Sequence, residues 1–123
     1  MGDSANVIIP EGVTKIEDKV FMNNEELQTI TLPETLREIG NETFRLCSSL
    51  KEITFPSGLK SIGDEAFRDC MALKDITLPQ GLKSIGKFAF FGYEKNHKIT
   101  VPSSVEYVGD DAFDEGDIVH FEK

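Results

Sequence analysis

Short hydrophobic segments recur along the chain, and a proline follows each one. Two apolar residues flank a central residue in all of these segments, which cover residues 7–9, 30–32, 53–55, 76–78 and 99–101. The prolines that follow are Pro10, Pro33, Pro56, Pro79 and Pro102, so every interval is 23 residues. The alternation predicts a short strand with two side chains in the core, and proline ends its hydrogen bonding because it has no N–H. The chain is therefore expected to repeat every 23 residues.

Other apolar positions keep the same period. A phenylalanine lies eleven residues after each proline, at Phe21, Phe44, Phe67, Phe90 and Phe113. Branched apolar residues lie three and six residues after it, at Val13, Leu36, Leu59, Leu82 and Val105 and at Ile16, Ile39, Ile62, Ile85 and Val108. Leucine lies seventeen after it in the first three repeats (Leu27, Leu50, Leu73), where the fourth has Asn96. Each column is expected to stack on its equivalents, so that stability comes from contacts between neighbouring coils.

The rest of each repeat predicts a second extended segment, a turn and a short helix. Residues 36–39 and their equivalents are expected to be extended, and residues 64–69 are expected to form one or two helical turns. Between them lie glycines expected to turn at positive φ, namely Gly40, Gly63, Gly86 and Gly109. The next positions suit a helix N-cap and hold Asn41, Asp64 and Asp110. Glu17 and Lys87 break these two columns.

The fullest repeat has the pattern Leu50-x-x-Ile53-x-Phe55-Pro56-x-x-Leu59-x-x-Ile62-Gly63-x-x-Ala66-Phe67-x-x-Cys70-x-x-Leu73. This pattern resembles the BspA-type (Treponema-type) leucine-rich repeat, and the resemblance extends from about Val7 to Phe113. An asparagine ladder after the strand is missing, since Thr35, Gly58 and Gly81 lie near its site. The resemblance implies a curved solenoid, and it implies bacterial or protozoal surface proteins used in adhesion to host proteins or other cells. It assigns no binding residue.

Period and resemblance together predict one domain over residues 1–123 with an α/β repeat fold. We expect a right-handed leucine-rich-repeat solenoid of about five 23-residue coils, with short parallel strands on one side and short helical turns on the other. The repeats are about 7–29, 30–52, 53–75, 76–98 and 99–123, the last with a C-terminal cap. Residues 118–123 keep apolar residues but shift their phase, and they are expected to close the sheet as a final strand. Open strand edges invite association, so weak self-association through the solenoid ends is a further expectation.

Charge and length narrow the class of partner and the compartment. The net charge is −9 and the pI about 4.6, which disfavours nucleic acid because phosphate binding needs a basic surface. No apolar run approaches the roughly 18 residues that a membrane span needs. The start of the chain does not read as a signal peptide. We expect an extracellular or cell-surface location with signal and anchor outside this chain, and a cytoplasmic scaffold is the alternative.

Few residues suggest chemistry, and no enzyme, metal or cofactor motif is expected. Cys47 and Cys70 share one phase, so they predict either buried free thiols or a disulfide between adjacent coils. The acidic run 110–117 does not fit a calcium loop, because its glycine comes seventh rather than sixth. A solvated end-cap fits it better. The segment Gly58-Leu-Lys-Ser61 lacks nucleophile-turn spacing and recurs one period later.

The candidate partner-binding residues fall into two groups. In the first group, threonines lie two residues before the prolines and have variable neighbours, which predicts either support of the sheet or a binding surface. The candidates are the ladder residues Thr31, Thr54, Thr77 and Thr100 and their neighbours Glu52, Asp75 and Lys98. Phe88 replaces charged residues of the other repeats, Phe91 replaces Met22 and three charged residues, and Tyr93 replaces the cysteine. These aromatics predict either an exposed contact or packing under residues 117–123.

The expected partner is a protein, namely a host or matrix protein or another cell surface. A glycan is the alternative, because Arg37, Lys60 and Lys83 form a short basic stripe on an acidic chain. Most basic stripes of this kind are only solvated surface, so the sequence leaves both interpretations of the stripe open.

Overall fold

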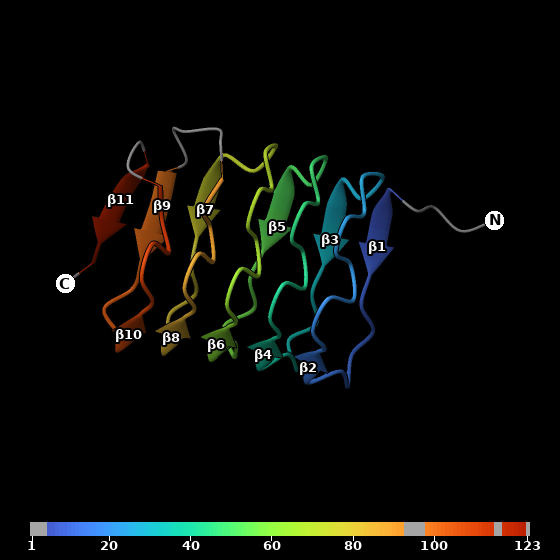
Figure 1. Cartoon of the computed structure of the whole chain (residues 1–123). Helices are drawn as coiled ribbons and strands as arrows, with labels where there is room; N and C mark the ends of the chain where they lie inside the picture. Colours follow the sequence, from blue (N-terminus) through green and yellow to red (C-terminus); the bar gives the residue numbers. More distant parts are fainter. Residues whose placement is uncertain (1–4, 93–97, 115–116, 123) are drawn as a thin grey trace.

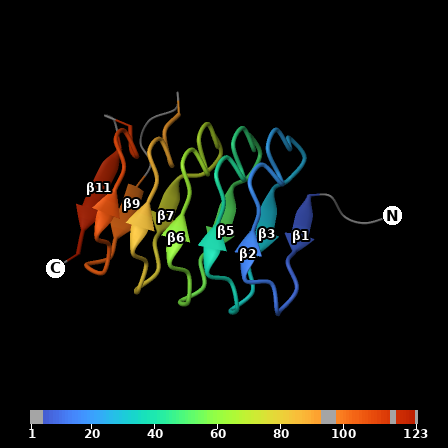
Figure 2. The same cartoon turned by 60° about the horizontal axis from the view of Figure 1, so that its bottom comes forward.

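The computed structural model describes residues 5–92, 98–114 and 117–122, and these form a solenoid of five coils (Figure 1). One long side, named here the threonine face, carries β1 (Asn6–Ile8), β3 (Thr29–Thr31), β5 (Glu52–Thr54), β7 (Asp75–Thr77), β9 (Lys98–Val101) and β11 (Ile118–Phe121). A second strand row carries β2 (Lys15–Ile16), β4 (Glu38–Ile39), β6 (Ser61–Ile62), β8 (Ser84–Ile85) and β10 (Tyr107–Val108). Figure 2 turns this second row toward the viewer. All pairs are parallel, as the repeat predicts.

The third side of each coil consists of turns, and the predicted helical turns are wrong. Residues 64–69 form hydrogen-bonded turns rather than a helix. Glu65 and Asp69 have φ of 57° and 62°, and Glu42 and Leu46 repeat these values one coil earlier at 56° and 63°. A left-handed residue interrupts an α-helix, because the helix needs negative φ at every position. This side is named here the turn side.

The glycine column is confirmed as a structural feature, but its predicted positive φ is wrong. Among the described glycines, only Gly12 and Gly81 have positive φ. A Cβ on Gly63 would lie 2.7 Å from the carbonyl carbon of Gly40 and 2.8 Å from the amide nitrogen of Asn41. The column therefore holds glycine because neighbouring backbones touch there. In the first coil Glu17 fills this position, where the described structure has no coil on that side.

The polar column predicted to cap helices instead joins neighbouring coils. The side-chain Oδ1 of Asp18 accepts the amide hydrogen of Asn41 at 2.7 Å, and that of Asn41 accepts the amide hydrogen of Asp64 at 2.8 Å. Asp64 Oδ1 in turn accepts the amide hydrogen of Lys87 at 3.0 Å. Lysine has no acceptor, so the ladder ends at Lys87. The repeat therefore has a polar ladder between coils, but it lies on the turn side and not directly after the strand, where the asparagine ladder is missing.

The apolar columns stack as predicted and form one core. The phenylalanine rings lie 5.4, 5.0, 5.2 and 6.1 Å apart from Phe21 to Phe113, with interplanar angles of 1–12°. Leu27, Leu50 and Leu73 are buried, whereas Asn96 lies outside the described residues. The closing strand is also confirmed, since β11 pairs with β9. Ile118 faces Lys98 in that pair, an offset of 20 residues, and this shorter coil explains the shift in phase.

The two strand rows differ in continuity. The second row is one sheet of five strands from β10 to β2. The threonine face is divided into two three-stranded sheets, β1-β3-β5 and β11-β9-β7. Among the described residues no hydrogen bond joins β5 to β7, and Figure 1 shows these two strands further apart than their neighbours. The period of the sequence gives no warning of this break.

Candidate functional site

The threonine ladder lies on the surface of the threonine face. Thr31, Thr54 and Thr77 are exposed and Thr100 is half-buried. Thr31 is in register with Thr54, and Thr77 is in register with Thr100. The break between β5 and β7 divides the ladder into these two pairs. Ile8, two residues before Pro10, extends one end of the row. His120 extends the other end, at a position that the proline-based spacing did not select.

A second row of side chains runs parallel to the threonines and is mostly charged. Glu52, Asp75 and Lys98 occupy it and are all exposed. Asp75 and Lys98 are in register on neighbouring strands, yet their charged atoms do not come within ion-pair distance in the described part of the chain. The structure thus brings all seven ladder and flanking candidates onto one surface.

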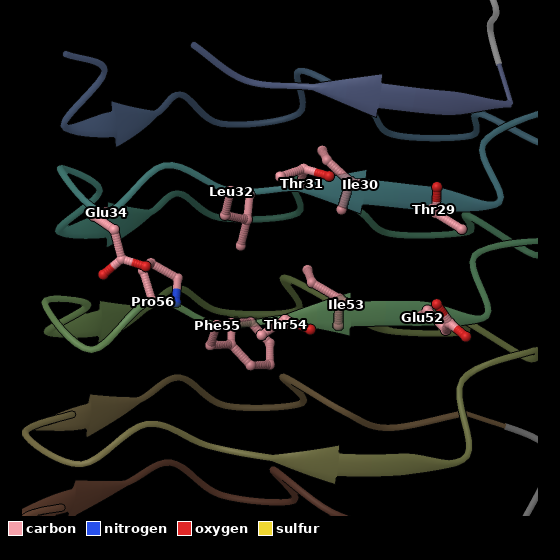
Figure 3. A pocket seen from close by; sticks show the side chains of 10 residues that line it. All are labelled: Thr29, Ile30, Thr31, Leu32, Glu34, Glu52, Ile53, Thr54, Phe55 and Pro56. Carbon is pink, nitrogen blue, oxygen red and sulfur yellow. The ribbon is translucent and has the colours of Figure 1, made fainter. Parts of the chain in front are cut away.

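Two hollows interrupt this surface, one on each side of β5. The first has a volume of about 420 Å³ and lies between β3 and β5, with Glu34, Glu52 and Thr54 among its lining residues (Figure 3). The second has a volume of about 360 Å³ and lies between β5 and β7, with Asp75 and Gln80 at its border. Both are open to solvent on the threonine face and lined by polar and apolar groups together.

The two hollows share the lining residues Ile53, Thr54 and Phe55, and the sequence analysis treated Phe55 only as core. The residues that directly precede the other prolines are Ile9, Leu32, Leu78 and Val101, so Phe55 is the one aromatic residue at this phase of the repeat. Phe121 of β11 is in register with Val101 but is exposed, whereas Phe55 is buried. The ring meets that of Phe67 edge to face, with centroids 5.7 Å apart and planes at 89°. Ile53 is half-buried, whereas Ile30, Ile76 and Ile99 of the same column are buried. The larger residue in the column was the available signal for the hollows.

Phe88 and Phe91 lie on the turn side, away from the threonine face. Their rings meet edge to face at 5.3 Å, and both are half-buried. The guanidinium of Arg68 lies 4.8 Å from the centroid of Phe88 and 5.4 Å from that of Phe91. Cation–π contact with a neighbouring coil therefore occupies these rings, an arrangement that neither prediction for them included. Tyr93, the third predicted aromatic, lies outside the described residues.

The aromatic pair ends a ladder of ion pairs on the turn side. Arg45 Nη1 lies 2.9 Å from Glu42 Oε2 and 3.1 Å from Glu65 Oε1. Arg68 Nη1 lies 3.0 Å from the same oxygen of Glu65. In the fourth coil Phe88 takes the glutamate position, so Arg68 has ring faces where Arg45 has a carboxylate. These charges are internally paired and leave little for a ligand.

Both cysteines are buried free thiols, which decides between the two predictions for them. The Sγ of Cys47 donates to the carbonyl of Phe21 at 3.1 Å, and that of Cys70 donates to the carbonyl of Phe44 at 3.0 Å. Burial raises the pKa of the Cys47 thiol to about 11 and that of Cys70 well above its usual range. Reactive cysteines need a lowered pKa and access to solvent, so these thiols act as structural donors.

The acidic C-terminal run is partly ordered by backbone contacts. Asp114 is buried and its Oδ2 accepts the amide hydrogen of Gly92 at 2.7 Å. The amide of Asp114 donates to Asp117 Oδ2 at 3.0 Å. Asp114 is therefore not the solvated residue that the end-cap interpretation expected. Within residues 5–92, 98–114 and 117–122, no group of three or more potential ligands could hold a metal ion, and no helix is long and apolar enough to cross a membrane.

The basic stripe of Arg37, Lys60 and Lys83 lies beside the second strand row, and two of its three side chains contact other groups of the chain. Arg37 Nη1 donates to the carbonyls of Glu34 and Leu36 at 3.0 and 3.2 Å. Lys83 Nζ lies 3.6 Å from Glu106 Oε2. Lys60 is exposed between them. The glycan alternative therefore has fewer free charges than the sequence suggested.

Comparison with known proteins places these features in a family. The BspA type leucine rich repeat region matches residues 3–121 in six copies. A leucine-rich repeat protein of T. pallidum is similar in structure, with a TM-score of 0.83 and 29% identity over 91% of this chain and 55% of that one. A Bacteroides ovatus leucine-rich repeat protein gives 0.80 and 39% identity over 88% and 30%. This chain thus spans less than two thirds of either protein.

A leucine-rich cell surface protein of Faecalibacterium prausnitzii is more distant. Its TM-score is 0.60 and its identity 25%, over 93% of this chain and 46% of that one. No match was found among curated proteins. The family is typical of surface proteins and of protein-interaction modules. Because six copies of the repeat match over nearly its whole length, the chain belongs to the BspA-type leucine-rich-repeat family.

Proposed function

We propose that this chain is a non-enzymatic protein-binding module that recognises its partner through the threonine face. The observation that carries the proposal is the pair of open hollows on either side of β5, bordered by exposed threonines and unpaired carboxylates. Polar ladders with hollows between them offer hydrogen bonds and shape for specificity, which are the needs of an interface. The other two sides offer less, because their charges are largely paired within the chain.

The proposed setting is the surface of a cell or the extracellular space, where the partner is a host or matrix protein or the surface of another cell. Support comes from the family and from the similarity to a cell surface protein of Faecalibacterium prausnitzii. An enzymatic role has no support in the residues, since the thiols are buried with raised pKa values.

A binding assay with matched variants tests the face. Purified chain is titrated onto a panel of immobilised matrix proteins, and the variants Glu52→Lys and Glu38→Lys are compared on any protein that binds. Both glutamates are exposed and begin a strand, but Glu52 lies on the threonine face and Glu38 in the second strand row. We expect Glu52→Lys to weaken binding about tenfold and Glu38→Lys to have little effect. Equal affinity of both variants would place the interface elsewhere.

A further inference from the structure

The break between β5 and β7 leaves strand edges open inside the threonine face. At equivalent positions the amide of Ile9 donates to the carbonyl of Thr31 at 2.9 Å, and the amide of Leu78 donates to the carbonyl of Thr100 at 3.0 Å. The amide of Leu32 makes no such bond to Thr54 in the described structure, although β3 and β5 pair along their strands. The amide of Phe55 has no such bond to Thr77 in the described structure. Unpaired backbone groups at a strand edge are a ready site for an added strand.

Phe55 explains why the edges stay apart. The other residues that directly precede a repeat proline are smaller and aliphatic, and the aromatic Phe121, in register with Val101 on β11, is exposed rather than packed in the core. The Phe55 ring is instead braced edge-on against Phe67, which is fixed between the rings of Phe44 and Phe90. Because Phe67 cannot give way, the added volume of Phe55 is taken up at the surface, where β5 and β7 separate. The gap is therefore built into the core rather than into a loop.

The charged residues that line the two hollows are all carboxylates, and Lys98, in register with Asp75, lies on the far side of β7. Glu52 and Asp75 are exposed on the two strands that border the gap, and Glu34 lies across the first hollow. None of the three carboxylates lies within ion-pair distance of a cation in the described part of the chain. Three unpaired carboxylates beside open backbone edges favour a partner with positive charge, because opposite potentials attract across an interface.

We propose that the gap between β5 and β7 binds an extended basic segment of a partner protein, which adds as a strand to the open edge of β5. The proposal rests on the proposed function and names the chemistry of its partner. Backbone hydrogen bonds to the edge near Phe55 hold the segment. Its apolar side chains enter the two hollows, and its lysine or arginine side chains face Glu34, Glu52 and Asp75.

Charge decides against the competing occupants. A nucleic acid would bring phosphates to these carboxylates on a chain of net charge −9. A second copy of this chain carries the same net charge, so its approach to the acidic gap is opposed. A basic extended polypeptide satisfies the open backbone edge and the unpaired carboxylates together.

The probe is a fluorescent octapeptide of alternating lysine and valine with blocked termini. Its counterparts replace lysine by glutamate, or carry N-methyl groups on alternate backbone amides. We expect the lysine peptide to bind, the glutamate peptide not to bind, and N-methylation to weaken binding about tenfold by removing strand hydrogen bonds. Fluorescence anisotropy measures affinity. Amide hydrogen exchange at Ile53, Phe55 and Thr77 locates the site, and slower exchange there on peptide addition is the expected result.

Two variants of the protein test the gap between β5 and β7 as the binding site. Phe55→Leu restores the residue type of the column and is expected to let β5 and β7 pair, which slows exchange at Phe55 without peptide and weakens peptide binding about tenfold. Asp75→Asn keeps the gap and removes one charge, so it should weaken the lysine peptide less, by about threefold, and more at low than at high salt. Glu38→Lys, on the second strand row, is the control and should bind as the parent does.

The outcomes distinguish strand addition in the gap from binding elsewhere on the threonine face. If Phe55→Leu binds the peptide undiminished, or if exchange slows away from β5 and β7, the proposed binding in the gap is wrong. A folded Phe55→Leu variant is verified by its circular dichroism, and if it does not fold the Asp75→Asn and N-methyl results decide alone. If Glu52→Lys loses matrix-protein binding but the parent chain does not bind the peptide, the threonine face is supported as the interface and the addition of a basic strand is rejected. No effect in either assay rejects both.

Discussion

The ring of Phe67 stacks on that of Phe44, with centroids 5.0 Å apart and planes inclined by 12°. It stacks equally closely on Phe90 and is buried, so it links three coils at once. We expect Phe67→Ala to lower the free energy of unfolding by about 3–5 kcal/mol, because a large cavity opens at the centre of the stack. Urea denaturation measures it.

Phe113→Ala is the matched control for the ring stack. Phe113 is half-buried and meets one ring, that of Phe90, at 6.1 Å. Its loss should cost clearly less than that of Phe67, since the end of a solenoid has one neighbour instead of two. Equal costs at the two positions would mean that the stack does not carry the stability of the solenoid.

Close approach of coils at the glycine column predicts a second set of effects. A Cβ at position 63 would meet backbone atoms of Gly40 and Asn41 at 2.7 and 2.8 Å, and backbone cannot turn aside as a side chain can. Gly63→Ala is therefore expected to cost about 1–3 kcal/mol by overpacking, measured as a shift in the denaturation midpoint. Glu17→Ala, at the same phase of the first coil, should change stability little. A neutral Gly63→Ala would contradict the backbone contact as the reason for glycine.

The amino-acid sequence predicted the solenoid well, because its signals repeat. Five phenylalanines at one phase must stack if the coils stack, and the rings of Phe21 to Phe113 do so. The turn side could not be predicted, because Glu42 and Leu46 adopt left-handed φ without being glycine. Asn41 and Asp64 suited a helix cap in the sequence, but their side chains reach the next coil.

The candidate site was predicted only in part, and for a different physical reason. The threonine ladder follows from alternation on each strand, so Thr31 and Thr77 were placed correctly on one surface. Both hollows are lined by Phe55, whose ring meets that of Phe67, and these two residues lie twelve apart in sequence and meet only in the folded coil. Phe88 and Phe91 were noticed as exceptions, but the ring contact with Arg68 of the preceding coil could be seen only in the structure.

The contact between Arg68 and Phe88 predicts coupling across two coils. Arg68 lies 4.8 Å from the ring centroid and also pairs with Glu65. A double-mutant cycle with Arg68→Ala and Phe88→Ala should give a coupling energy of about 0.5–1 kcal/mol in chemical denaturation. Pairing Phe88→Ala with Lys60→Ala, which lies beside the second strand row, is the control and should be additive. A coupling energy near zero for the first pair would show that the ring contact does not stabilise the fold.

The buried thiols predict a loss of stability in alkali. Burial raises the pKa of Cys47 from the ordinary value of 9.0 to about 11, so in the folded state the thiol keeps its proton over this range. The unfolded chain loses it near pH 9, and unfolding is therefore favoured progressively as the pH rises toward 11. The stabilisation from this group is fully present below pH 9 and is lost as the pH rises through the window between the two values. Cys70, whose pKa is also raised, adds to the effect in the same direction.

Comparison of the parent chain with Cys47→Ser/Cys70→Ser isolates this contribution. Serine keeps a donor for the carbonyls of Phe21 and Phe44 but does not titrate in this range. We expect the free energy of unfolding of the parent to fall more steeply than that of the variant between pH 9 and 11, measured by urea denaturation under reducing conditions. All other side chains are the same in the two proteins, so their effects cancel in the difference. Parallel profiles would mean that the thiols ionise as readily in the folded chain as in the unfolded one.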